Sequence, residues 1–181
     1  MKGDGLQRLR ALLREQGGLM ATLLASGSAV GEDSGGASHS PARVAAGGPR
    51  AAGRREEYEL LVEAIYEGYL LHYGAPRVLH APEADLGLLA GDQLYAMGLA
   101  RLVALGDMEA VAELADTITL SALAHGAGEQ GMAAAVWAAG ARAVGWGSSE
   151  PHRRAKELAF SGAPGAVAAL RRSAAATPEL A

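Results

Sequence analysis

The stretch "LLAGDQLYAMGLARLVALGD", residues 88–107, places Asp92 and Gln93 inside an otherwise apolar helix. A carboxylate among leucines needs a partner, because an unpaired charge is costly to bury. Arg77, Arg101 or the end of a neighbouring helix could supply that partner. We expect Asp92 to be buried and to accept hydrogen bonds there in a structural role rather than a catalytic one.

A row of carboxylates precedes this helix. Glu59, Glu63 and Glu67 are spaced four residues apart and therefore share one helical face. Such a row could face a metal ion, but like charges at this spacing are unfavourable unless water solvates them. We therefore expect this face to be exposed to solvent.

Two histidines provide a second possible metal site. His72 and His125 could converge with Asp92 and Glu129 in a bundle and bind a transition metal. Histidines near the C-terminal ends of helices more often interact with the helix dipole. We expect that role here, and we expect the chain to hold neither a metal nor another cofactor.

Tyrosines gather on one face of the same helix. Tyr66, Tyr69 and Tyr73 fall at positions i, i+3 and i+7, and Tyr95 lies on the following helix. A tyrosine presents an apolar ring and a polar tip, which suits a pocket for an apolar chain or an interface. The plainer interpretation, which we favour, is that they lie at the edge of the core.

Residues 63–131 contain "EAIYEGYLLHYGAPRV" and "LLAGDQLYAMGLARLVALGDMEAVAELADTITLSALAHGAGEQG". They resemble the central part of the trans-isoprenyl diphosphate synthases, in which a long helix reads roughly A-x-L-A-G-D-x-L-L-A-x-A. The most specific matches are Ala90, Gly91, Asp92, Leu94 and Ala96. The resemblance implies an all-α bundle of the isoprenoid-synthase kind.

The chain departs from that family where the family does its chemistry. Those enzymes bind an allylic diphosphate through magnesium ions held by aspartate-rich motifs. Leu71 and His72 fit the start of the first motif, but Tyr73 and Gly74 stand in place of its first two aspartates. Residues 132–181 offer no candidate for the second motif. We therefore expect no diphosphate chemistry from this chain.

Helices must position all of these residues. The apolar spacing predicts helices over 54–73, 82–105, 107–126, 132–146, 152–160 and 165–176. The pattern of apolar and polar residues divides the chain into three predicted parts: an amphipathic helix in residues 1–30, a flexible linker over 31–53 and a helical core over 54–181. The linker is inferred because 31–53 is rich in Gly, Ser, Ala and Pro without apolar periodicity.

Gly87, Gly91 and Gly98 leave one face of the 82–105 helix nearly bare. Another helix must approach closely there, either in this chain or in a second copy of it. We expect the chain to be at least a dimer, paired so as to cover four apolar residues of the same helix: Leu94, Met97, Leu99 and Leu102.

Composition limits the function classes. The 181 residues carry a net charge of −4, so nucleic acid is a poor candidate partner. The absence of cysteine excludes disulfides and thiolate sites and suits the cytosol. The most apolar stretch, 86–105, contains charged residues, so no membrane span is expected.

Together these observations predict an all-α, isoprenoid-synthase-like helical bundle, truncated relative to that family and without its catalytic apparatus. The expected function is a non-catalytic interaction or regulatory subunit that pairs with itself or with a protein partner. One alternative is a carrier or sensor of an isoprenoid or other apolar small molecule; another is the small subunit of a heteromeric prenyl diphosphate synthase. The candidate ligand or interface residues are His72, Tyr73, Arg77, Asp92, Tyr69, Tyr95, Gly91 and Gly98.

Overall fold

The computed structural model describes residues 5–24 and 40–176, and in these ranges the chain is all-helical, as predicted. None of the described helices is long and apolar enough to cross a membrane. The elements are α1 Gly5–Gln16, α2 Gly18–Thr22, α3 Pro41–Gly47, the 3-10 turn η1 Pro49–Ala51, α4 Arg55–Tyr73, α5 Ala84–Ala104, α6 Met108–Gly126, α7 Gln130–Trp146, α8 Glu150–Phe160 and α9 Ala166–Ala175.

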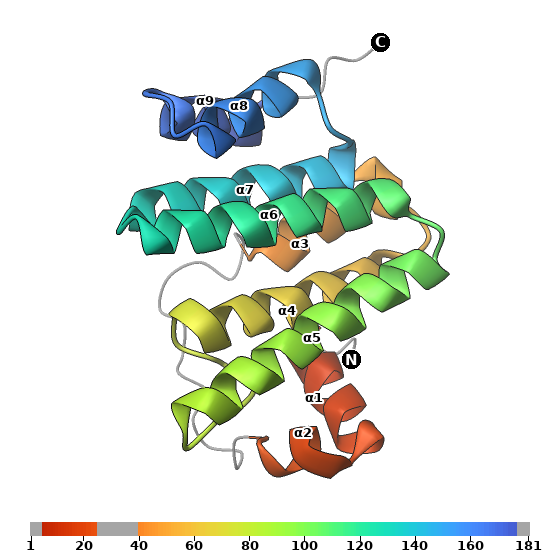
Figure 1. Cartoon of the computed structure of the whole chain (residues 1–181). Helices are drawn as coiled ribbons and strands as arrows, with labels where there is room; N and C mark the ends of the chain where they lie inside the picture. The colour runs from red at the N-terminus through yellow and green to blue at the C-terminus, as the bar shows by residue number, and fades with distance from the viewer. Residues whose placement is uncertain (1–4, 25–39, 177–181) are drawn as a thin grey trace.

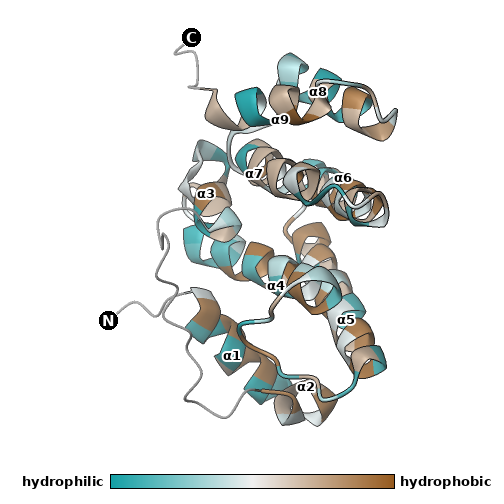
Figure 2. Cartoon of the chain, turned by 90° about the vertical axis from the view of Figure 1, so that its left-hand side faces the viewer, coloured by the Kyte–Doolittle hydropathy of each residue, from teal (hydrophilic) through white to brown (hydrophobic). Residues whose placement is uncertain are grey.

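The helices form stacked antiparallel pairs (Figure 1). The α6/α7 pair lies on the α4/α5 pair, the α8/α9 pair covers the far side of α6/α7, and α1 and α2 lie at the opposite end of the stack. Turned by 90°, the molecule shows α3 wedged between α4 and α7 (Figure 2). The candidate site lies beside α3, between α4 and α7.

The core helices end where the sequence predicts. Gly74 terminates α4 and donates its backbone N–H to Leu70 O at 2.9 Å. Asp107 caps α6 by accepting from the backbone N–H of Ala110 at 3.0 Å. Its carboxylate also accepts from Tyr58 and from Arg50, so this cap joins η1, α4 and α6.

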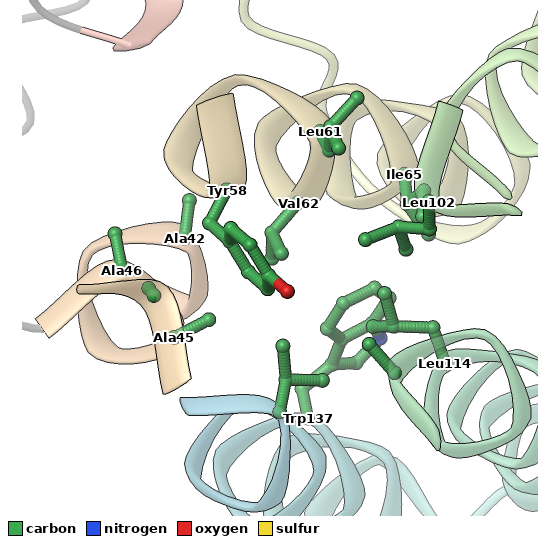
Figure 3. Close-up of a cluster of buried hydrophobic side chains, with 13 residues drawn as sticks. Ala42, Ala45, Ala46, Tyr58, Leu61, Val62, Ile65, Leu102, Leu114 and Trp137 are labelled. Atoms are coloured by element: carbon green, nitrogen blue, oxygen red, sulfur yellow. The ribbon is translucent and has the colours of Figure 1, made fainter. Parts of the chain in front are cut away.

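The central core lies between α3, α4, α6 and α7 (Figure 3). Tyr58, Val62 and Ile65 of α4 face Leu114 of α6 and Trp137 of α7 across it. A second apolar cluster joins α6 and α7 to α8 and α9, and a third joins α1 and α2 to α4 and α5. The pairs are therefore held together by apolar burial on both sides.

The predicted linker is wrong over residues 41–51, which form α3 and η1. Ala42, Ala45 and Ala51 are fully buried in the central core. A Cβ added to Gly48 would lie 2.5 Å from the Cα of Gly145, so the two backbones touch. The packing of α3 depends on small residues and on contacts between backbones. Neither gives the sequence the apolar periodicity from which a packed helix is predicted. Residues 31–39 of the predicted linker lie outside the described residues.

The N-terminal helix is part of the bundle rather than a tethered appendage. Leu9 and Leu13 of α1 are fully buried against α4 and α5. Arg8 pairs with Glu59, and Arg10 donates to the carbonyl of Arg77 at 2.8 Å. The apolar side of the amphipathic helix α1 therefore covers the outer face of α4.

The glycine face of α5 packs against α4 of the same chain. A Cβ on Gly98 would lie 2.8 Å from Ile65 Cδ1, and one on Gly91 would lie 2.5 Å from His72 Cδ2. Leu94 and Leu102 are fully buried within the chain, while Met97 and Leu99 are partly buried. Of the two predicted alternatives, a helix of the same chain or of a second copy, the structure shows the first, because α4 occupies this face. The dimer stays a prediction.

Candidate ligand-binding site

A cavity of about 580 Å³ lies between α3, α4, α6 and α7, with the end of α9 at its edge. We call it the aromatic pocket. Its walls are Tyr66, Tyr69 and Tyr73 of α4, Trp137 of α7 and His125 of α6. Both interpretations of the three tyrosines apply: they line this pocket, and Tyr66 and Tyr69 also lie at the edge of the central core.

Helical spacing brings these side chains together. The tyrosines share one face of α4 because they fall at i, i+3 and i+7. Across the pocket, α7 contributes Ala134, Ala138 and Ala141, which are spaced i, i+4 and i+7. The tyrosine rings of α4 face the alanine methyl groups of α7. Because the methyl groups are small, space remains between the two helices.

The rings pack against one another in defined geometry. Tyr66 meets the edge of Trp137 with centroids 4.8 Å apart, and Tyr69 lies 5.2 Å from the same indole. Tyr66 and Tyr69 are stacked at 5.6 Å. Contacts of this kind add about 0.5–1.5 kcal/mol per pair beyond area burial, so the wall is rigid.

One polar pair lies in the wall. The Tyr69 hydroxyl and His125 Nε2 are 2.9 Å apart, and the His125 ring stacks flat on Tyr73 with centroids at 4.3 Å. Burial raises the pKa of the Tyr69 phenol, so that hydroxyl keeps its proton at neutral pH. His125 lies in the last turn of α6, as the dipole interpretation expects.

Asp92 is not buried, contrary to the prediction. Its side chain is 69% exposed, and its partner is His72 of α4, with Nε2 and Oδ1 3.2 Å apart. The reason is that Gly91 faces α4 and the next residue points about 100° away, toward solvent. Tyr95 stacks on the His72 ring at 5.3 Å, and burial raises the pKa of its phenol. Neither His72 nor Tyr95 lines the aromatic pocket.

In the carboxylate row of α4, Glu63 and Glu67 are buried and Glu59 is partly buried, so the prediction of a solvated face is wrong. Glu67 is fully buried and accepts the backbone N–H groups of residues 77–79 at 2.8, 2.6 and 3.2 Å. Glu63 accepts from Arg77 at 2.6 Å and from Ser40 at 2.8 Å. The Arg77 guanidinium also lies 5.0 Å from the centroid of the Tyr66 ring. These carboxylates anchor the segment that follows α4.

Metal ligation finds no support in residues 5–24 and 40–176. No group of three or more His, Asp or Glu side chains lies close enough there to hold an ion. His72 pairs with Asp92, whereas His125 pairs with Tyr69, so the two histidines and Asp92 do not form one group.

Ser173, His152 and Glu113 form a buried chain that sequence reasoning missed. His152 Nε2 lies 2.6 Å from Glu113 Oε1, and its Nδ1 lies 3.2 Å from Ser173 Oγ. These are the residue types of a hydrolytic triad. However, all three are buried, Ser173 donates to the Leu170 carbonyl at 2.8 Å, and Lys156 binds the second Glu113 oxygen at 2.7 Å. The chain therefore ties α6 to α8 and α9.

This network predicts a pH dependence of stability. Burial opposes ionisation of Glu113, but hydrogen bonds and charge from His152 and Lys156 prevail and hold its pKa below the ordinary value. A lowered folded-state pKa stabilises the fold above the unfolded value, and that stability is lost as pH falls through the folded-state pKa. We expect urea unfolding between pH 7 and pH 3 to show a smaller acid-induced loss of stability in Glu113→Gln than in wild type. An exposed control, Glu57→Gln, should keep the wild-type loss; equal losses in all three proteins would contradict the assignment.

Comparison of the chain with family models, with curated proteins and with solved structures found no match.

Proposed function

We propose that this protein binds an apolar small molecule in the aromatic pocket and acts as a non-catalytic carrier or sensor. The observation that supports this most is the pocket itself, which is built within one chain. Its volume of about 580 Å³ lies inside the usual range for small-molecule sites. Aromatic rings and alanine methyls provide most of its surface, with few polar groups.

The residues that line the pocket favour binding over catalysis. Among the described lining side chains there is no Asp, Glu, Ser, Lys or Arg, so the pocket offers neither a carboxylate nor a serine paired with a base. Tyr73, which stands where the resemblance would require an aspartate, is one of the pocket's rings. A resemblance to isoprenoid synthases suits a pocket for an unsaturated apolar molecule.

We test the proposal by filling the pocket. The probe is N-phenyl-1-naphthylamine, a neutral dye whose emission rises in an apolar site. Ala138 is exposed and lines the pocket, so Ala138→Trp adds bulk without entering the core. We expect Ala138→Trp to weaken dye binding at least about tenfold, since an indole would occupy the dye's volume.

The matched control is Ala115→Trp, at an exposed position of α6 that does not line the pocket. It should bind the dye like wild type. Failure of the wild type to bind, or equal binding by Ala138→Trp and Ala115→Trp, would overturn the proposal.

A second candidate function, an interaction subunit, is supported by the outer faces of α5 and α6. Leu89 and Val103 of α5 are 62% and 50% exposed, and Met108 and Leu123 of α6 are 58% and 54% exposed. Leu89, Ala96 and Val103 are seven residues apart, the spacing of a helix seam. A second copy of the chain, related by a twofold axis, would cover such a seam with its own.

For this candidate we expect light scattering to report a dimer at micromolar concentration. The double variant Leu89→Glu/Val103→Glu should be monomeric because it buries charges in the seam. Gln93→Glu, an exposed change on the same helix, is the control. A monodisperse wild-type monomer would refute pairing through this face.

A further inference from the structure

We infer that the ligand of the aromatic pocket is a neutral, unsaturated or aromatic molecule with one hydrogen-bond-accepting oxygen, which binds at the Tyr69–His125 pair. This inference rests on the proposed function and specifies the ligand's chemistry. Three properties of the pocket support it: one polar pair, Tyr69 and His125, lies in its wall, this pair keeps a proton to donate, and the described lining residues carry no compensating charge.

The polarity of the pocket follows from the order of the helices. The chain turns between the end of α6 and the start of α7, which places His125 beside Gln130. The C-terminal end of α4 lies at the same side of the bundle (Figure 1), and Tyr69 and Tyr73 come from it. The residues farther along α7, such as Ala138 and Ala141, offer methyl groups. A ligand therefore meets the Tyr69–His125 pair at this end and alanine methyl groups farther along α7.

The hydrogen-bond directions define what the polar end can bind. The Tyr69 phenol keeps its proton, because burial raises its pKa, and a phenol donates readily to an imidazole nitrogen. Where His125 Nε2 accepts from Tyr69, the ring carries a proton on Nδ1; where Nε2–H donates to the Tyr69 oxygen, the Tyr69 hydroxyl proton is left. In either tautomer the pair keeps one N–H or O–H, and Gln130 adds an amide, so the ligand should present an acceptor oxygen.

The described lining residues lack the positive charge that an anionic head group would need in the aromatic pocket. The described lining residues include no Lys or Arg that could compensate a carboxylate or a diphosphate. Arg77 lies against the Tyr66 ring, but Glu63 and Glu67 already bind its guanidinium at 2.6 and 3.4 Å. An uncompensated anion in an apolar site is strongly disfavoured. A hydroxyl or ketone oxygen meets no such penalty.

Three ligands with one ring system separate these cases: naphthalene, the ketone 2-acetylnaphthalene and 2-naphthoate. Each is titrated calorimetrically and by displacement of N-phenyl-1-naphthylamine at pH 7. We expect the ketone, whose oxygen can only accept, to bind at least about tenfold more tightly than either of the others. The double variant Tyr69→Phe/His125→Phe keeps two rings and removes the polar pair, so it should abolish the preference for the ketone and still bind the dye.

The control is Tyr95→Phe, which removes a hydroxyl outside the pocket and should keep the wild-type preference. Equal binding of the ketone and naphthalene by wild type, tightest binding of naphthoate, or an undiminished preference in Tyr69→Phe/His125→Phe would each overturn the inference. In those cases dye binding that Ala138→Trp blocks would still support the proposed function. No binding of the dye or of any naphthalene would overturn both.

Discussion

We expect Glu67→Ala to lower the free energy of unfolding by about 3–5 kcal/mol. The Glu67 carboxylate is fully buried and accepts three backbone N–H groups from residues 77–79, and its second oxygen lies 3.4 Å from Arg77 Nε. Alanine would leave those N–H groups without an acceptor. Each buried donor without a partner costs about 1–3 kcal/mol, and the guanidinium would lose part of its counter-charge.

Urea unfolding followed by circular dichroism measures this loss. Glu57→Ala, an exposed change in the first turn of the same helix, should cost only a few tenths of a kcal/mol. Glu67→Gln keeps an acceptor oxygen and should fall between the two. If Glu67→Ala were as stable as Glu57→Ala, the carboxylate would not be holding the segment after α4.

The same carboxylate supports the aromatic pocket from outside. The segment that it anchors carries Arg77, whose guanidinium lies 5.0 Å from the Tyr66 ring centroid. Tyr66 in turn packs on Trp137. The pocket wall therefore depends on residues that do not touch the pocket, and the stability of the fold is coupled to the shape of the site.

Local signals in the sequence were sufficient to predict the core helices. Gly74 ends α4 and Asp107 caps α6 through a bond to Ala110, and both effects operate within a few residues. The spacing of Tyr66, Tyr69 and Tyr73 likewise predicted a shared face, with the edge of the core as the favoured position and a pocket as the alternative. Such features are readable because the residues that cause them are neighbours in the chain.

The carboxylate row shows where this reasoning fails. Repulsion among Glu59, Glu63 and Glu67 is local and predicted solvent exposure, but their partners are distant in the chain. Arg8 is 51 residues from Glu59, and Arg77 is 14 residues from Glu63. No local pattern pairs these charges, because only the packing of α1 and of the segment after α4 brings them together.

The site was predicted only in part for the same reason. The sequence identified the tyrosines, but Trp137 and the alanines of α7 looked like ordinary helix residues, and His125 was assigned only to the helix dipole. The contact of His125 with Tyr69 spans 56 residues. A stripe of alanines opposite a stripe of rings is a usable signal, but it becomes one only once α4 and α7 are known to face each other.

Helix α3 is the element that was hardest to predict from the sequence. Its packing on α7 gives the second prediction with a large expected effect. We expect Gly48→Ala to destabilise the fold by about 3 kcal/mol or more. The backbone of Gly48, with φ −77° and ψ 162°, suits any residue, so conformation is not the obstacle. Space is the obstacle, because a Cβ would overlap the carbonyl of Gly145 and lie 2.5 Å from its Cα. Backbone atoms of α7 cannot rotate away as a side chain can.

Gly126→Ala is the matched control, since Gly126 ends α6 with no atom within 4 Å of an added Cβ. It should be neutral or gain up to about 1 kcal/mol from helix propensity. Because α3 contributes Pro41 and Val44 to the aromatic pocket, Gly48→Ala should also weaken binding of N-phenyl-1-naphthylamine, whereas Gly126→Ala should not. Urea unfolding and dye titration of both variants test this. If Gly48→Ala matched Gly126→Ala in both measurements, residues 41–51 would not be packed on α7, and the pocket would lack one of its walls.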